Sequence, residues 1–395
     1  MKNILFVQDG FYQSGGERQL YEIIKILESH YKTHYNIRFL IYAEEFKEEY
    51  YYDKLLQLEI PIDFISSKIP DLNRILSVLD KVFFCLLKKM PFLGLQRKRQ
   101  RKQFHDVFSD VDLLVNNKVF LLLDLQKHIP KDIPVIHHAI IISKQFSSSD
   151  AQEFSSPYRQ LNIEKLYVSY PCMQMKHEIE SQLGDRVEKY YRIDLPASVN
   201  FREPQLYKNR EFTMAYVARV HHDKAFTVIL PVIHELMTRG VAVKCYLVGR
   251  QDNPGFVRVL RRTIGLLRIK KHIEMVPHLS ELHSLSDYKI DIVLAGGVHD
   301  FIGYSSIDVV AAGFPVLLWD QGDLDSREKD PSSDVFPRST SIRDYCDKIE
   351  YYASKPAERL KLAQGQQAAL EKLHDPELIG AATRQCYDDV LTINT

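Results

Sequence analysis

Short runs of apolar residues recur along the first half of the chain and alternate with longer amphipathic segments. The apolar runs cover residues 4–7, 37–42, 62–65, 113–115, 135–136 and 166–168. Buried strands of a parallel sheet have this nearly continuous apolar character, and helices connect such strands. After the first run, Leu20, Ile23, Ile24 and Leu27 follow the i, i+3, i+4, i+7 spacing of a helix with one buried face. The first half is therefore predicted to be a parallel α/β domain.

The alternation is interrupted at residues 194–212, where Pro, Ser, Asn and charged residues replace it, as is typical of a linker. Apolar runs resume at residues 212–220, 241–250, 273–277, 291–297 and 315–320, so the second half is predicted to be another doubly wound α/β domain. Two helices are expected to follow, from Pro356 and from Pro376. We place an N-terminal domain at residues 1–200 and a C-terminal domain at residues 206–375, with residues 376–395 packing back on the first domain.

The composition fits two folded domains and narrows the class of partner. The chain has 395 residues, more than one hydrophobic core usually organises, and 52 Lys and Arg balance 52 Asp and Glu. Because no net charge attracts a polyanion, nucleic acid is not expected as a partner. The five cysteines are scattered and never in CxxC spacing, which argues against disulfides and thiolate metal sites and favours a reducing cytoplasm.

No segment is predicted to span a membrane, but one is predicted to lie on it. The first apolar run is too short for a signal peptide, and no run approaches the roughly 18 residues of a spanning helix. Residues 72–93 place apolar side chains on one broad helical face, and an interfacial segment of this kind carries cations beside that face. A core helix followed by a solvated basic loop is the alternative. The basic cluster consists of Arg97, Lys98, Arg99, Arg101 and Lys102.

Two cations follow the first strand of the second half. Arg219 and Lys224 lie five positions apart in "ARVHHDK". Ligands of doubly wound sheets bind beyond the carboxyl ends of the strands, and a pair of cations there suits a diphosphate. An ordinary surface loop with two basic residues is the alternative.

A second candidate segment, "GGVHDFIGYSSIDVVAAGFPV", runs from a strand into a helix that its Gly-Phe-Pro sequence ends. The backbone N–H groups of Gly303, Tyr304 and Ser305 would stand at the helix N-terminus, where anions bind. Asp300 before the turn and Asp308 within the helix supply carboxylates for sugar and ribose hydroxyls. In the alternative interpretation, Asp300 caps the helix and Asp308 is solvated.

The second half resembles the nucleotide-binding domain of the family 4 retaining glycosyltransferases, whose GT-B fold has two Rossmann-like domains facing a cleft. "ARVHHDKA" is similar to their Gly-Arg-Leu and Lys-Gly motif, with alanines where glycines are usual. "DFIGYSSIDVVAAGFPV" is similar to their signature of two glutamates eight positions apart, which are Asp300 and Asp308 in this chain. "LVGR" and "IEMVPHLSELHSL", with Arg250 and Val276, resemble the segments that border the nucleotide base.

The first half resembles the same family more loosely, with its motifs in the same order. "SGGER" stands where the family has Gly-Gly-Ala-Glu-Arg, which implies that the backbone of Gly15 and Gly16 approaches the donor diphosphate and the acceptor sugar. Where the family often has a histidine after a strand, this chain has Asn116 and Asn117. His138, after the next strand, is the nearest candidate for a catalytic histidine, and a structural role is its alternative.

The resemblance implies a retaining glycosyltransferase in which Arg219, Lys224 and a helix N-terminus stabilise the leaving nucleoside diphosphate. It implies a nucleotide-sugar donor and no cofactor. Because no Asp-x-Asp motif stands in a suitable loop, no essential metal is expected. The basic cluster favours a saccharide or polyprenyl-linked acceptor in polysaccharide or cell-envelope biosynthesis, and a cytoplasmic protein held peripherally at the inner face of the membrane. Because Asp replaces both glutamates, a non-catalytic GT-B-fold binding subunit is an alternative. A sugar-nucleotide epimerase of the same architecture is another.

Overall fold

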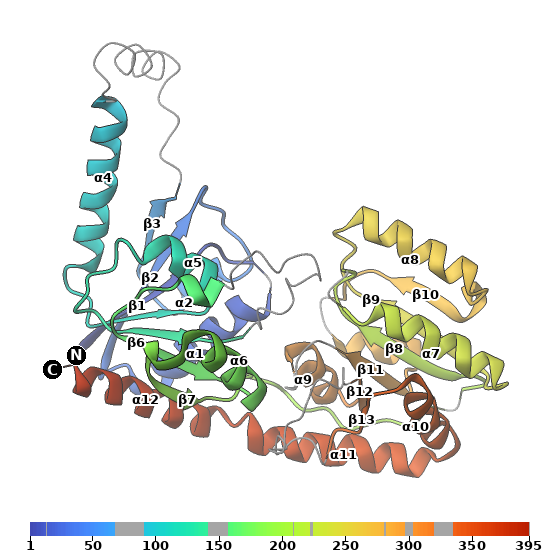
Figure 1. Ribbon diagram of the computed structural model, residues 1–395. Coiled ribbons are helices and arrows are strands. Elements are labelled where there is room, and N and C mark those ends of the chain that lie inside the picture. Colours follow the sequence, from blue (N-terminus) through green and yellow to red (C-terminus); the bar gives the residue numbers. More distant parts are fainter. Residues whose placement is uncertain are drawn as a thin grey trace. The chain divides into compact units, whose positions relative to one another are not determined.

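The computed structural model describes the whole chain other than residues 13, 68–90, 141–156, 208, 222–223, 280–281, 297–302, 320–334 and 395, and the side chains of residues 91–97 and 174. The chain divides into two compact units (Figure 1). Unit 1 comprises Met1–Pro171, Met175–Pro196 and Pro376–Thr395, and unit 2 comprises Cys172–Gln174 and Ala197–Asp375.

Unit 1 is built on a parallel sheet with the strand order β3-β2-β1-β4-β5-β6-β7. Its strands are β1 Lys2–Gln8, β2 Tyr35–Ala43, β3 Ile62–Ser66, β4 Leu113–Asn116, β5 Val135–His138, β6 Leu166–Tyr170 and β7 Val187–Arg192. Its helices are α1 Gly15–Tyr31, α2 Tyr52–Gln57, α4 Pro91–Phe108, α5 Val119–Leu125, α6 Met173–Leu183 and α12 Pro376–Ile393, with 3₁₀ turns at Pro157–Gln160 and Gly184–Arg186.

Unit 2 repeats this plan with the strand order β10-β9-β8-β11-β12-β13, again all parallel. Its strands are β8 Phe212–Val217, β9 Val243–Val248, β10 Ile273–Val276, β11 Ile292–Gly296, β12 Val316–Trp319 and β13 Arg338–Ser339. Its helices are α7 Phe226–Thr238, α8 Pro254–Leu266, α9 Tyr304–Ala311, α10 Ile342–Ser354 and α11 Pro356–Leu373, with 3₁₀ turns at Lys270–His272 and Leu282–Tyr288.

Each sheet reverses its strand order at one point. In unit 1 the reversal lies between β1 and β4, and in unit 2 it lies between β8 and β11. The connections on the two sides of such a point leave the sheet in opposite directions, which opens a crevice at the carboxyl ends of the strands where ligands bind. A functional site is therefore expected at these two edges.

The last helix, α12, is part of unit 1 and packs against α1. A Cβ atom added to Gly380 would lie 2.6 Å from Cγ2 of Ile26, so the two helices approach closely because this residue has no side chain. The Tyr35 hydroxyl donates a hydrogen bond to Oδ1 of Asp388 at 2.6 Å. Tyr387 and neighbouring residues of α12 are buried in the same core as β1 and β2. The prediction that the C-terminal helix packs back on the first half is confirmed.

The parallel α/β architecture of both halves is also confirmed, but two strands were not predicted. β7 is an edge strand with largely exposed or half-buried residues, and β13 has two residues at the other sheet's edge. Edge strands need no continuous apolar run, because one side of the strand faces solvent. In the described part of the chain, we find no helix with the length and apolar character needed to cross a membrane.

Candidate functional site

The loops after β8 and β9 lie against each other at the carboxyl edge of the unit 2 sheet. The Val220 N–H donates to the Arg250 carbonyl at 2.8 Å, and the Gly249 N–H donates to the Val276 carbonyl at 3.2 Å. A Cβ atom on Gly249, whose φ is +155°, would lie 2.0 Å from the Ala218 carbonyl oxygen. Glycine is therefore required here, and the close packing holds Arg219 and Arg250 in adjacent loops at one edge.

The Tyr216 hydroxyl fixes the loop between β8 and α7, beside the point where the strand order reverses. It accepts a hydrogen bond from the Ala225 N–H at 2.8 Å and lies 3.3 Å from the Gly296 carbonyl, to which it donates. A Cβ atom on Gly296 would lie 2.8 Å from Cβ of Ala225, so the end of β11 and the start of α7 are in close contact. Lys224 precedes Ala225 and is thereby held beside this crevice.

Helix α9 begins at the same edge of the sheet. Gly303 is its N-cap and has extended backbone geometry, and its carbonyl accepts from the N–H groups of Ser306 and Ile307 at 2.9 and 3.1 Å. Tyr304 is buried, whereas Ser305 is exposed and Asp308 is half-buried one turn later. The helix N-terminus carries a positive partial charge that suits an anion. Asp300 lies outside the described residues.

The predicted end of this helix is confirmed. Gly313 has a φ of +95°, and its N–H donates to the Val310 carbonyl at 3.0 Å while the Phe314 N–H donates to the Val309 carbonyl at 3.2 Å. This pair of bonds is a Schellman motif, which satisfies the last carbonyls of a helix and favours glycine. The stop fixes the length of α9 and hence the position of its N-terminus.

The structure places Val276 at the end of β10, beside the loop that carries Arg250. Its side chain is buried at the end of β10, and its carbonyl accepts the hydrogen bond from Gly249. In this arrangement Val276 supports the loop that carries Arg250.

Unit 1 has a polar network at its own reversal point that the sequence did not reveal. Gln8 Nε2 donates to Asn117 Oδ1 at 2.7 Å, and Asn117 Nδ2 donates to the Gly16 carbonyl at 2.7 Å and to Gln19 Oε1 at 3.2 Å. These groups are buried, so their hydrogen bonds avoid the penalty of unpaired polar atoms. The network fixes the start of α1 against β1 and β4. In the sequence, the signal for this network was the presence of polar residues directly after two of the apolar runs.

Lys118 extends this network toward the surface. Its Nζ lies 2.5 Å from carboxylate oxygens of both Glu17 and Asp9, and Glu17 also accepts from the Ser14 hydroxyl. Glu17 is 4% exposed. Burial lowers the pKa of the Lys118 ammonium, but the charges of Glu17 and Asp9 outweigh that effect, and the pKa is raised. The Lys118 ammonium is thus held at the carboxyl edge of the sheet by two carboxylates.

The two glycines of "SGGER" have different surroundings. Gly15 is exposed as the first residue of α1, with Ser14 as the N-cap. Gly16 is buried, its carbonyl bonded to Asn117, and a Cβ atom there would lie 3.5 Å from Asn117 Nδ2. Of these two glycines, Gly15 is the exposed one.

His138 has the surroundings of a core residue. Its Nδ1 contacts the Ser169 hydroxyl, and its Nε2 lies 2.8 Å from the Tyr387 hydroxyl. The side chain is completely buried, and burial together with the neighbouring His137 lowers its pKa to about 3. A neutral, enclosed imidazole with both nitrogens occupied fits the structural interpretation, and we assign His138 no contact with substrate.

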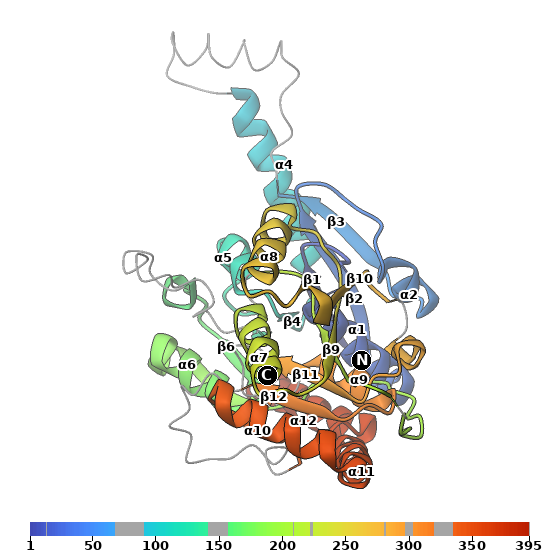
Figure 2. The ribbon, with the colours of Figure 1, turned by 90° about the vertical axis from the view of Figure 1, so that its right-hand side faces the viewer.

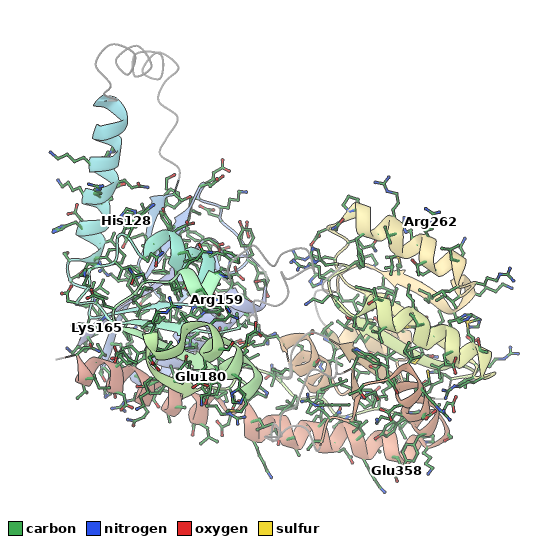
Figure 3. The ribbon with its side chains drawn as sticks, viewed as in Figure 1. His128, Arg159, Lys165, Glu180, Arg262 and Glu358 are labelled. Atoms are coloured by element: carbon green, nitrogen blue, oxygen red, sulfur yellow. The ribbon has the colours of Figure 1, made fainter. Side chains whose placement is uncertain are left out.

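The basic cluster lies on a helix rather than in a loop. Lys98, Arg99, Arg101 and Lys102 are exposed on α4, which extends past the sheet of unit 1 (Figure 2). Near the C-terminal end of α4, Phe104 is buried and stacks on His128 with 4.0 Å between ring centroids. Figure 3 labels His128 beside this helix. The Arg97 side chain and most of the apolar segment, residues 72–90, lie outside the described residues.

Comparison with known proteins shows similarity of structure without similarity of sequence. No protein-family model and no curated protein matches the chain. HepE from Anabaena, solved in complex with UDP and glucose, has a TM-score of 0.67 at 14% identity, over 98% of this chain and 100% of its own. Sucrose-phosphate synthase from Thermosynechococcus elongatus has a TM-score of 0.70 at 12% identity, over 100% of both chains. The lipopolysaccharide outer core galactosyltransferase WaaB has 0.64 at 12% identity, also over 100% of both.

These similarities extend over the whole chain and show that it has the GT-B fold, as predicted. The loops of Arg219, Lys224, Arg250 and α9 all lie at the carboxyl ends of the unit 2 strands, the edge at which doubly wound sheets in general bind ligands. At the level of architecture, the chain is a GT-B protein with two Rossmann-like units.

Proposed function

We propose that the protein is a glycosyltransferase that moves a sugar from a nucleotide-sugar donor to a saccharide or lipid-linked saccharide acceptor. The observation that carries the proposal is the convergence of Arg219, Lys224 and the N-terminus of α9 on one edge of a GT-B-fold sheet. The neighbours support it by analogy, since HepE was solved with UDP and glucose and WaaB is a galactosyltransferase.

The proposed chemistry is stabilisation of the leaving group. As the bond between the sugar C1 and the donor oxygen breaks, negative charge grows on the β-phosphate. Arg219, Lys224 and the α9 N–H groups would hold that charge more strongly in the transition state than in the ground state, which accelerates the step. Asp308 would accept hydrogen bonds from the ribose. Because these cations and dipoles serve the diphosphate, no essential metal is proposed.

Retention of the anomeric configuration is proposed from the resemblance to family 4. The acceptor is proposed to be bound at the carboxyl edge of unit 1, where Gly15 is exposed. The cations of α4 would hold the enzyme at the anionic surface of the membrane that carries the acceptor, at about 1 kcal/mol for each cation near that surface.

The test is transfer of label from donor to acceptor. The full chain is incubated with membranes containing polyprenyl-linked saccharides and with a panel of labelled nucleotide sugars, and the label in the lipid-saccharide fraction is counted. The proposal expects one donor to label this fraction and the Lys224→Ala variant to lower the rate at least about 100-fold, as loss of a transition-state charge contact does. Conversion of free donor to an epimer would favour the epimerase, and nucleotide binding without transfer would favour the binding subunit.

A further inference from the structure

Helix α8 and the turn that follows it form a cationic surface on unit 2. Residues 253–273 contain no Asp or Glu. The helix begins at a well-formed cap, in which Asn253 Oδ1 accepts from the Phe256 N–H at 3.0 Å and Pro254 occupies the first turn. We define the α8 surface as its exposed cations: Arg258, Arg261, Arg262, Arg268, Lys270 and Lys271.

The outward side of α8 also carries aliphatic side chains. Val257, Leu260 and Ile264 are buried against unit 2, whereas Val259 is 59% exposed and Leu266 is 73% exposed. Val259 and Leu266 are seven residues apart, so they lie on the same side of the helix.

Arg262 lies between these two aliphatic residues along the helix. It is three residues after Val259 and four before Leu266, so the three side chains share one stripe. Figure 3 shows Arg262 on the side of α8 turned away from the sheet. The outermost stripe of the helix is therefore aliphatic, cationic and aliphatic in order.

We infer that the α8 surface docks unit 2 on an anionic lipid bilayer. Six cations without an acidic residue among them complement a negatively charged surface, and exposed aliphatic residues between them can enter the boundary between headgroups and acyl chains. A nucleic acid would use the cations but would leave Val259 and Leu266 in water. The aliphatic stripe thus favours lipid over a dissolved polyanion.

The inference deepens the proposed function, on which it rests for its biological purpose, because it gives the nucleotide-binding unit a membrane contact separate from α4. Its physical test is independent. Vesicle binding requires neither donor nor acceptor, so a chain that binds vesicles through α8 but no nucleotide keeps this inference and loses the proposed function. A chain that transfers sugar, but whose vesicle binding is unaffected by the α8 substitutions, keeps the proposed function and loses this inference.

The experiment measures flotation of the full chain with phosphatidylcholine vesicles that contain either no or about one-third phosphatidylglycerol, at physiological ionic strength where cations still contribute. The test variant is Arg258→Gln, Arg261→Gln and Arg262→Gln together. The matched control is Lys355→Gln, Lys361→Gln and Lys372→Gln, which removes the same charge from exposed positions on and beside α11. A third variant combines Val259→Ser with Leu266→Ser.

Each cation near the bilayer changes the partition coefficient about fivefold, so the α8 triple variant is expected to bind anionic vesicles about 100-fold more weakly than the wild type. The control triple is expected to stay within about threefold of the wild type. The Val259→Ser and Leu266→Ser variant is expected to bind anionic vesicles about tenfold more weakly, because it removes two aliphatic side chains that would be partly buried in the bilayer. All variants change exposed residues, and unchanged melting temperatures verify that they fold.

Two results would overturn the inference. One is an α8 triple variant that binds anionic vesicles as the wild type or the control triple does. The other is unchanged vesicle binding by the Val259→Ser and Leu266→Ser variant together with displacement of the wild type from vesicles by a short DNA duplex, which would assign the surface to a dissolved polyanion.

Discussion

The Ala218 carbonyl oxygen lies 2.0 Å from the position that a Cβ atom on Gly249 would occupy. The loops after β8 and β9 can therefore pack together only because residue 249 is glycine. Arg219 and Arg250 depend on this contact for their positions, although the contact itself involves no charged group.

Gly249→Ala is expected to separate the two loops. A clash with backbone cannot be relieved by a rotamer change, so we expect unit 2 to lose about 2–4 kcal/mol of its free energy of unfolding and the chain to bind nucleoside diphosphates at least tenfold more weakly. Trp319 is the single tryptophan and lies in unit 2, so its fluorescence in urea follows this unit. Gly265→Ala on α8, where a Cβ atom meets nothing within 4 Å, is the control. It should stabilise unit 2 by about 0.5–1 kcal/mol and leave nucleotide binding unchanged.

Removing Lys118 alone should lower the free energy of unfolding of unit 1 more than removing the charges of Lys118 and Glu17 together. Lys118→Met leaves the buried Glu17 carboxylate without its cation, and we expect a loss of about 2 kcal/mol because Lys118 itself is partly exposed. The double variant Lys118→Met with Glu17→Gln should recover at least half of that loss. Urea unfolding followed by circular dichroism, at concentrations where Trp319 fluorescence does not change, reports unit 1. A double variant less stable than Lys118→Met would contradict the role given to Glu17.

The buried histidines should make unit 1 sensitive to acid. Burial lowers the pKa of both His137 and His138 to about 3. The unfolded chain takes up protons at about pH 6.5 and the folded chain does not, so the stability is complete above pH 6.5 and is lost as the pH falls toward 3. At pH 5 each histidine lowers the free energy of unfolding by about 2 kcal/mol relative to its value above pH 6.5.

The check is the difference between the free energies of unfolding of unit 1 at pH 7 and pH 5. His138→Gln should reduce this difference by about 2 kcal/mol. Equal differences in wild type and His138→Gln would show that His138 is protonated in the folded protein.

Metal removal should not affect the donor site. If Arg219, Lys224 and the α9 N-terminus neutralise the diphosphate, sugar transfer and UDP affinity in excess EDTA should stay within about twofold of their values in magnesium. Activity that disappears in EDTA and returns with a divalent cation would show that a metal performs part of this task.

The main architecture could be predicted from the sequence because buried parallel strands are nearly continuous apolar runs. β1, β2, β8 and β9 all follow this rule, whereas β7 and β13 lie at sheet edges and do not. The basic cluster was identified, but its helical conformation in α4 was not, because the cations repeat without an apolar period.

The candidate site was predictable only in part. The spacing of Arg219 and Lys224 and the Gly313 helix stop are local features of the sequence. The supporting contacts are not local: the Tyr216 hydroxyl joins three elements, and Asn117 contacts Gly16 across 101 positions. Such contacts follow from strand order, which brings distant strand ends together at one edge.

The measurement that tests the central claim most directly is calorimetric titration of the full chain with UDP, alongside other nucleoside diphosphates, for the wild type and Lys224→Ala. The account predicts that at least one nucleoside diphosphate binds the wild type with micromolar to submillimolar affinity. Lys224→Ala should weaken that binding about tenfold or more, since a charge-assisted contact contributes about 1.5–3 kcal/mol. No binding at millimolar concentration, or equal binding by both proteins, would contradict the assignment of this edge of unit 2 to a nucleotide-sugar donor.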